Sequence, residues 1–196
     1  MKYAMTKWLI PVAAALWLTG CSDQNWRTTD ISDVMPPLDF TLVDENGRDV
    51  NAEDYLGKAT LLYFGYTHCP DVCPTTLARI AAASKRLDDT LRDDLQVLFV
   101  SVDPGRDTPE VMKGYTEIFG PQFVGLTGDR AQIDALTNRY RISYEYGEKD
   151  DNGGYDVSHS SAIFAFDPRG NAKLLIRDSD PMDNVVADIA RLAAQG

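Results

Sequence analysis

Residues 59–74 read Ala-Thr-Leu-Leu-Tyr-Phe-Gly-Tyr-Thr-His-Cys-Pro-Asp-Val-Cys-Pro, and they carry the strongest structural signal in the chain. The first half, Ala59 to Tyr66, is a continuous apolar run of the kind that forms a central strand buried on both faces. From Pro74 to Leu87 apolar residues recur at helical spacing, and proline suits the first turn of a helix. A buried strand that leads into a helix is typical of an open α/β sheet, which keeps its functional sites in such connections.

The alternation of strands and helices continues along the chain. Asn46-Gly47 predicts a tight turn, because both residues tolerate positive φ. Further strands are expected at Phe40–Val43, Asp49–Asn51, Leu95–Val102, Phe123–Leu126, Ile142–Tyr146, Tyr155–Val157, Ala162–Phe166 and Lys173–Arg177, and further helices at Thr108-Pro109, Asp129–Tyr140 and Pro181–Ala194. The pattern predicts one α/β domain in which helices flank a central mixed sheet, with an N-terminal β-hairpin.

Composition excludes several classes of protein. The chain has 196 residues, of which 44% are hydrophobic and 25% charged, as in ordinary soluble domains rather than disordered chains. Its net charge of −11, from 19 Lys and Arg against 30 Asp and Glu, argues against binding to the phosphate backbone of a nucleic acid.

The first residues have the features of a secretory signal peptide. A basic start is followed by the apolar run Leu9–Leu18 and by Leu18-Thr-Gly-Cys21, which resembles the bacterial lipobox with Cys21 as the lipidated residue. A plain membrane anchor is the alternative, but the run has about half the length that a span needs. We therefore expect a bacterial cell-envelope protein, held at the membrane by a lipid, with its domain facing the periplasm or the exterior.

Three segments follow from this interpretation. Residues 1–20 are the signal peptide, residues 21–37 are the lipidated N-terminus and a flexible tether, and residues 38–196 are the domain. The tether is polar and ends in Pro36-Pro37, so Trp26 is expected to be solvated there.

Two cysteines, Cys69 and Cys73, lie four residues apart where the central strand meets its helix. This spacing allows a disulfide and also allows both sulfurs to reach one metal ion. A helix N-terminus is expected to lower the pKa of these thiols. A purely structural disulfide is the simplest alternative, although its short loop would add less than the ~3 kcal/mol of a 15-residue loop.

The chain holds only two histidines, and one of them, His68, adjoins Cys69. His159 precedes the Ala162–Phe166 strand and can face the cysteines if that strand neighbours the central one. Two thiolates and an imidazole favour copper(I) over magnesium, calcium or manganese. Zinc with a water as fourth ligand remains an alternative, and Asp71 and His68 are weaker candidate ligands.

Three segments resemble the Sco/SenC family, the copper chaperones of cytochrome c oxidase assembly. They are Tyr63–Pro74, Val100–Val111 and Val157–Gly170, and the likeness extends from about Pro36 to the last helix. The resemblance implies a thioredoxin-like fold. It also implies one copper ion held by Cys69, Cys73 and His159, as copper(I) with copper(II) as a second state, and delivered to the dinuclear copper centre in a subunit of a respiratory oxidase.

The resemblance also implies supporting residues. Asp103 and Arg106 match a family motif near the site, and His68, Asp71 and Asp103 are candidates for orienting the metal ligands. Asp71 is a candidate for a further oxygen ligand to oxidised copper. Many family members have aspartate directly before the ligand histidine, whereas this chain has Ser158.

Three functions compete at this stage. The first is a non-enzymatic copper metallochaperone. The second is a thiol–disulfide oxidoreductase in which Cys69 and Cys73 form a redox pair that keeps the target's copper-ligand cysteines reduced. Thioredoxin-like oxidoreductases usually space their two cysteines as C-x-x-C, whereas this chain has C-x-x-x-C. The third, a peroxiredoxin-like peroxidase, fits least, because Thr67 stands two rather than three residues before Cys69.

Overall fold

The computed structural model describes residues 25–151 and 153–196. The strands are β1 (Thr29–Asp30), β2 (Thr41–Asp44), β3 (Asp49–Asn51), β4 (Ala59–Gly65), β5 (Leu95–Ser101), β6 (Phe123–Thr127), β7 (Tyr144–Tyr146), β8 (Val157–His159), β9 (Ile163–Phe166) and β10 (Ala172–Ile176). The helices are α1 (Val72–Ser84), α2 (Asp89–Asp93), α3 (Pro109–Thr116), α4 (Arg130–Arg139) and α5 (Met182–Ala193), with a 3-10 helix at Ala52–Tyr55. The signal peptide and Cys21 lie outside the described residues.

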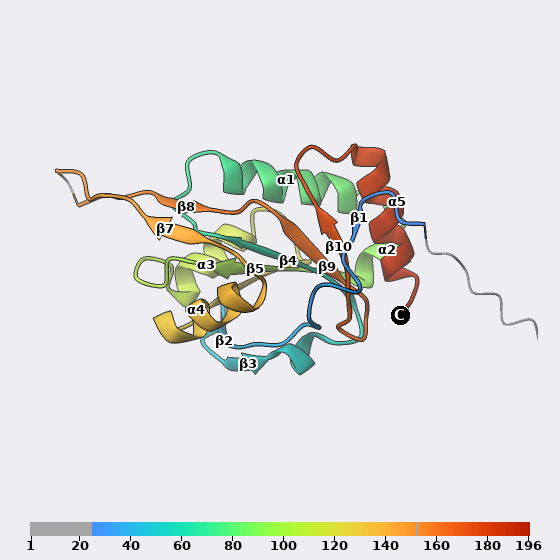
Figure 1. Ribbon diagram of the computed structural model, residues 1–196, viewed down its shortest axis with the longest axis horizontal. Helices are drawn as coiled ribbons and strands as arrows, with labels where there is room; N and C mark the ends of the chain where they lie inside the picture. The colour runs from blue at the N-terminus through green and yellow to red at the C-terminus, as the bar shows by residue number, and fades with distance from the viewer. Residues whose placement is uncertain (1–24, 152) are drawn as a thin grey trace, which may run out of the picture.

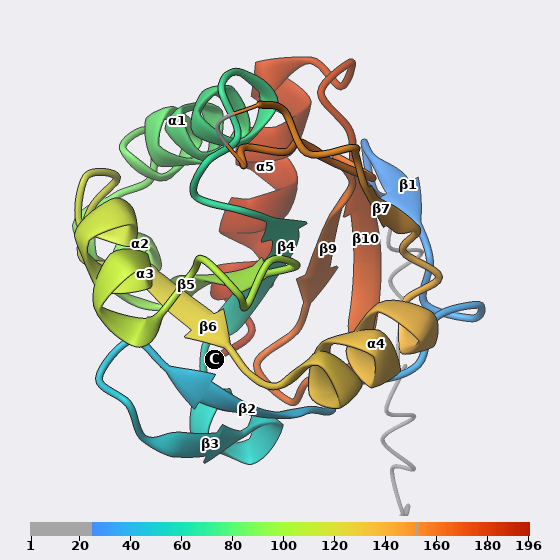
Figure 2. The ribbon, with the colours of Figure 1, turned by 90° about the vertical axis from the view of Figure 1, so that its left-hand side faces the viewer.

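A mixed sheet of eight strands forms the centre of the domain, in the order β1-β10-β9-β4-β5-β6-β2-β3. Strands β4, β5 and β6 run parallel, and β9 pairs antiparallel with β4. Helices α1 and α5 cover one face, and α4 lies on the opposite face (Figures 1 and 2). The expected α/β architecture is confirmed.

Strand β4 is buried on both sides, as its apolar run predicts. On one face Leu61 lines a small apolar gap with Ile80 of α1 and Ile189 of α5. On the other face the ring of Phe64 lies 6.3 Å from that of Tyr140, which ends α4. The core therefore fills both faces of the sheet and holds the carboxyl end of β4 in place.

Several local signals act as predicted. Gly47 has φ of +75° in the turn between β2 and β3. The Thr108 side chain caps α3 by accepting a hydrogen bond from the amide of Val111. The Asp129 side chain caps α4 by accepting one from the amide of Gln132. Each pairing satisfies an amide that the helix itself leaves without a partner.

Helix α1 begins earlier than the sequence suggested. Asp71 is its N-cap and Val72 its first residue, so Cys73 lies in the first turn and Pro74 follows it there. Proline is tolerated at that position because the first amides of a helix have no partner within the helix.

The expectation of a solvated Trp26 in a flexible linker is wrong. Trp26 is only 9% exposed, and Arg191 of α5 lies 4.7 Å from its ring centre. The buried carboxylate of Asp188 accepts hydrogen bonds from the amides of Arg27 and Thr28, after which β1 pairs with β10. Burial of a large aromatic ring and of a hydrogen-bonded carboxylate holds this part of the segment on the domain.

Strands β7 and β8 form a separate two-stranded sheet that we call the ribbon. The two strands pair antiparallel, with Tyr144 opposite His159 and Tyr146 opposite Val157. His159 is the last residue of β8 rather than part of the loop after it. The ribbon projects from the same end of the molecule as the loop that precedes α1 (Figure 1).

Candidate metal centre

The loop that carries the two cysteines leaves the carboxyl end of β4 next to a glycine that the sequence analysis overlooked. A Cβ atom on Gly65 would lie 2.7 Å from the Sγ atom of Cys73 and 2.7 Å from the ring of Phe99. Only glycine allows the thiol to approach the strand so closely. A glycine inside a buried strand is a known mark of close approach, so this signal was present in the sequence.

The loop is also held by Asp107, a second residue that the sequence analysis overlooked. This carboxylate is fully buried and accepts hydrogen bonds from the Thr67 amide at 3.0 Å, the Thr67 hydroxyl at 2.6 Å and the Ser101 hydroxyl at 2.6 Å. It thereby joins the connection after β4 to the connection after β5. No local pattern distinguishes Asp107 from an ordinary loop aspartate before helix α3.

Cys69, Cys73 and His159 come together at this point. Their candidate ligand atoms all lie within 4.8 Å of one another. The Sγ atom of Cys73 is 3.2 Å from Nε2 of His159, and the Cys73 amide donates to the Sγ atom of Cys69 at 3.4 Å. Both cysteines are free thiols. Two elements far apart in sequence thus converge on one site, because β9 neighbours β4 as the sequence analysis required.

The imidazole of His159 is oriented by its own chain. Its Nδ1 atom lies 3.0 Å from the carbonyl oxygen of Ser160. A carbonyl can only accept, so Nδ1 carries the proton and Nε2 of the neutral ring presents its lone pair to the cysteines. The rings of Tyr66 and Tyr63 stand edge-on to the imidazole, at 5.9 and 6.1 Å between centres.

Burial sets the protonation of the metal-free site. It raises the pKa of the Cys73 thiol to about 12, even though a backbone hydrogen bond at Tyr66 acts in the opposite direction. For this thiol the expected lowering by the helix N-terminus is wrong, because desolvation of a thiolate at the base of the site is the larger effect. Burial also lowers the pKa of His159 below its ordinary 6.5. At neutral pH, Cys73 and His159 are therefore both uncharged.

The other candidate residues lie outside the cluster. His68 is half exposed, and its Nδ1 atom contacts the Thr67 hydroxyl at 3.1 Å rather than the thiols. Asp71 is exposed at the start of α1. Within the described part of the chain, neither belongs to the group of potential metal ligands. Asp103 is buried and accepts a hydrogen bond from the Tyr155 hydroxyl at 2.8 Å, so it touches the ribbon rather than the cysteines.

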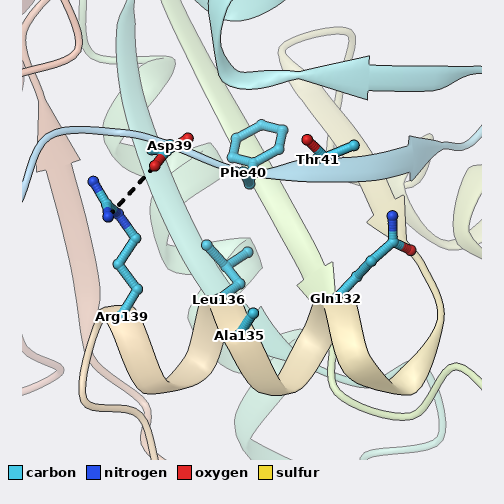
Figure 3. A pocket seen from close by; sticks show the side chains of 7 residues that line it. All are labelled: Asp39, Phe40, Thr41, Gln132, Ala135, Leu136 and Arg139. Carbon is cyan, nitrogen blue, oxygen red and sulfur yellow. Dashed lines mark ion pairs between the residues drawn. The ribbon is translucent and has the colours of Figure 1, made fainter.

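A surface groove elsewhere is unrelated to this cluster. It lies between residues 39–41 and α4, where Arg139 forms an ion pair with Asp39 at 3.4 Å (Figure 3). None of its lining residues is a cysteine or a histidine. Within the described residues, this groove therefore contributes no thiol or imidazole to the cluster at the end of β4.

Comparison with known proteins identifies the family of the domain. The SCO1/SenC family profile matches residues 32–194. The chain belongs to the SCO1/SenC family. It is 41% identical over 132 residues to the human mitochondrial protein SCO1 homolog, which covers 67% of this chain and 44% of the human protein. A SCO2-like protein of Rickettsia felis is 39% identical over 147 residues, 74% of this chain and 71% of that protein.

A solved SCO1/SenC structure supports the same placement. Bradyrhizobium japonicum ScoI with copper bound has a TM-score of 0.72 and 36% sequence identity, covering 80% of this chain and 98% of that one. The thioredoxin-like fold is thereby confirmed. The chain spans less than half of the human relative, so what the longer proteins do is a matter for proposal here. Across residues 25–151 and 153–196, no helix is both long and apolar enough to cross a membrane.

Proposed function

We propose that this protein binds one copper ion through Cys69, Cys73 and His159 and delivers it to the dinuclear copper centre of a respiratory oxidase. The observation that carries the proposal is the convergence of two thiols and one imidazole within 4.8 Å. Copper is the cargo in this proposal rather than a permanent cofactor.

The donor set fits copper(I). Thiolates are soft ligands, which select copper(I) over hard cations, and imidazole suits copper as well. A structural zinc site would use four protein ligands, whereas the described residues supply three in this group. Cys73 must lose its proton when copper binds, so binding releases protons and strengthens as the pH rises.

The unequal burial of the ligands suits transfer. Cys73 is fully buried, while Cys69 and His159 keep partial exposure. An incoming thiolate of the target can reach the metal from the Cys69 and His159 side while Cys73 still holds it. Release then proceeds by exchange of one ligand at a time, without free copper.

Relatives and the N-terminus support this function. Copper is bound in the solved structure of Bradyrhizobium japonicum ScoI, and this chain is 36% identical to that protein. Lipidation at Cys21 would hold the domain on the envelope membrane, facing the periplasm or the exterior, where it would meet the copper-site subunit of the oxidase.

Competition for copper(I) tests the proposal. The full chain carrying Cys21→Ser, in which the pair supplies the only thiols, is titrated against a coloured copper(I) chelator. We expect one tightly held copper per chain. Cys69→Ala or Cys73→Ala should abolish retention, and His159→Ala should weaken it. His68→Ala is the matched control, because it removes the only other imidazole, which is half exposed and outside the cluster. Equal retention in all four variants would refute the site.

The thiol–disulfide alternative uses the same cysteines but does not need the imidazole. Copper binding that is absent, or indifferent to His159, would favour a redox pair and make the reduction potential of Cys69 and Cys73 the next measurement. The position of Nε2 of His159, 3.2 Å from the Cys73 sulfur, favours the metal site.

A further inference from the structure

Among the described residues, the third candidate ligand lies on a part of the fold that shares no strand pairing with the main sheet. His159 ends β8, and β8 pairs only with β7 in the ribbon. The polar contacts of the imidazole are with the Cys73 sulfur and the Ser160 carbonyl. Its place relative to the cysteines therefore depends on how side chains hold the ribbon against the sheet.

The segment that leads into β8 is held through Tyr155, two residues before the strand begins. Its hydroxyl donates to the buried carboxylate of Asp103 at 2.8 Å. The guanidinium of Arg106 lies over its ring, with the Cζ atom 3.7 Å from the ring centre. Asp103 also accepts a hydrogen bond from Nε of Arg106, so the three side chains form a closed group that we call the clamp.

The clamp is also in contact with the wall of the candidate metal site. The Cζ atom of Arg106 lies 5.7 Å from the ring centre of Tyr66, and the Tyr66 ring stands at 90° to the imidazole of His159. The Nη2 atom of Arg106 is buried and has no hydrogen-bond partner among the described residues. A guanidinium kept in place at that cost is held by stacking and by Asp103, which is consistent with a positioning role.

The other strand of the ribbon is fixed independently. The Tyr146 hydroxyl donates to the Val102 carbonyl at 2.6 Å, and Arg130 lies 4.7 Å from the centre of the same ring. Contacts on β7 thus keep the ribbon folded against the sheet. Loss of the clamp would leave β7 anchored and release the residues that lead into β8, the strand that ends at His159.

We propose that Arg106 and Tyr155 are positioning residues that set the place of His159 against the two cysteines. The inference builds on the proposed copper site, and its first test uses substitutions that conserve charge. Arg106→Lys keeps the positive charge but removes the guanidinium that stacks on the Tyr155 ring. Tyr155→Phe keeps the ring but removes the hydroxyl. Long-range attraction of the site for copper is therefore unchanged in both variants.

Copper(I) affinity is measured by chelator competition in the full chain with Cys21→Ser. We expect Arg106→Lys to weaken binding about tenfold, the lower end of the loss seen when a residue that orients a ligand is removed, and Tyr155→Phe to weaken it less. In a His159→Ala background neither change should weaken binding further. Tyr140→Phe is the matched control, since it removes a hydroxyl that donates to the Pro37 carbonyl at 2.9 Å, away from the site, and should leave affinity unchanged.

A second measurement needs no copper. The chain has two histidines, so the NMR spectrum of the metal-free protein contains two imidazoles. We expect Arg106→Lys to broaden or shift the His159 signals through exchange between positions, while the His68 signals stay as they are. The Tyr140→Phe spectrum should match that of the unchanged chain at both imidazoles.

The outcomes separate this inference from the proposed function. An equal loss of affinity with and without His159 would overturn the inference, because the clamp would then act on the whole fold. Unchanged affinity together with unchanged His159 signals would also overturn it. If the unchanged chain binds no copper, the proposed function fails, and the NMR measurement still decides whether the clamp positions His159.

Discussion

The two segments that meet at the candidate metal centre are held by different means. The cysteine loop continues from β4, whose backbone pairs on both sides, and Asp107 fixes it by accepting three hydrogen bonds. His159 comes from the ribbon, which in the described part of the chain has no backbone pairing with the main sheet and is held against it by side-chain contacts. The difference indicates a preformed pair of thiols and an adjustable imidazole, which suits the proposed uptake and release of copper. Substitutions that disturb the cysteine loop should therefore reduce stability more than substitutions in the ribbon do.

Asp107→Ala should have the largest effect. It leaves the amide and hydroxyl of Thr67 and the hydroxyl of Ser101 without their acceptor in a buried place. We expect a loss of about 3 kcal/mol in the free energy of unfolding, measured with urea at neutral pH, because unpaired buried donors retain their desolvation cost. Asp89→Ala is the control: that carboxylate is exposed on α2, and its loss should cost less than about 0.5 kcal/mol. Similar losses in the two variants would mean that Asp107 does not anchor the loop.

Gly65→Ala should follow. The added methyl group would lie 2.7 Å from the Cys73 sulfur and from the Phe99 ring, so one of them must move. We expect a destabilisation of about 1–3 kcal/mol from overpacking and weaker copper(I) binding, because the sulfur is displaced from His159. Gly114→Ala is the matched control with the opposite expected sign. It lies within α3 with nothing near its Cβ position, and alanine there should stabilise the helix by up to about 1 kcal/mol. A Gly65→Ala protein with unchanged stability and affinity would show that the close approach has no consequence.

Asp107 and Gly65 also show which parts of the fold and site can be predicted from the sequence and which cannot. The buried run of β4, the helix caps at Thr108 and Asp129 and the neighbouring cysteines depend on local patterns, and local patterns can be recognised in one sequence. Asp107 has a partner 40 residues away and Trp26 has one more than 160 residues away, and no local pattern reveals either. Gly65 lies between these cases, since its presence in a buried strand is a signal whose partner only the fold identifies.

In the reduced, metal-free protein, the cysteine loop and the ribbon should each lower the folding stability at one end of the pH range, the loop at high pH and the ribbon at low pH. Burial raises the pKa of Cys73 from 9.0 to about 12, so the unfolded chain loses this proton first and stability falls as the pH rises above about 9. Burial lowers the pKa of His159 below 6.5, so the unfolded chain gains that proton first and stability falls as the pH drops below about 6.5.

Unfolding free energies of the unchanged chain and of Cys73→Ala, compared from pH 7 to pH 10, isolate the first effect from the ionisation of tyrosines, which both chains share. Their difference should fall with a slope of at most ~1.4 kcal/mol per pH unit. Measured below pH 7, the same comparison with His159→Ala should show a flatter curve, because this variant lacks the imidazole whose pKa is lowered. A constant difference between the chains above pH 9 would contradict the burial of the Cys73 thiol.

The smallest effect should come from Ser158→Asp, a change directly before the candidate ligand His159. Side chains alternate along a strand, and Ser158 is exposed next to His159, with its hydroxyl 3.4 Å from the Glu145 carbonyl. A carboxylate there faces water, which screens it from the copper site, so copper(I) affinity should change less than about threefold at 0.1 M salt.

The neighbouring carboxylate of Glu145 explains why an uncharged residue suits position 158. It lies directly opposite Ser158 in the ribbon, so an aspartate would place two like charges across the strand pair and destabilise it by a few tenths of a kcal/mol, ~0.5 at most. Ser158→Asn, which has the shape without the charge, should avoid this cost, and Glu145→Gln should remove it from the aspartate variant. If Ser158→Asp instead changes copper affinity tenfold while the asparagine variant does not, charge on the ribbon reaches the metal. The imidazole would then be tuned by its strand neighbour as well as positioned by the clamp.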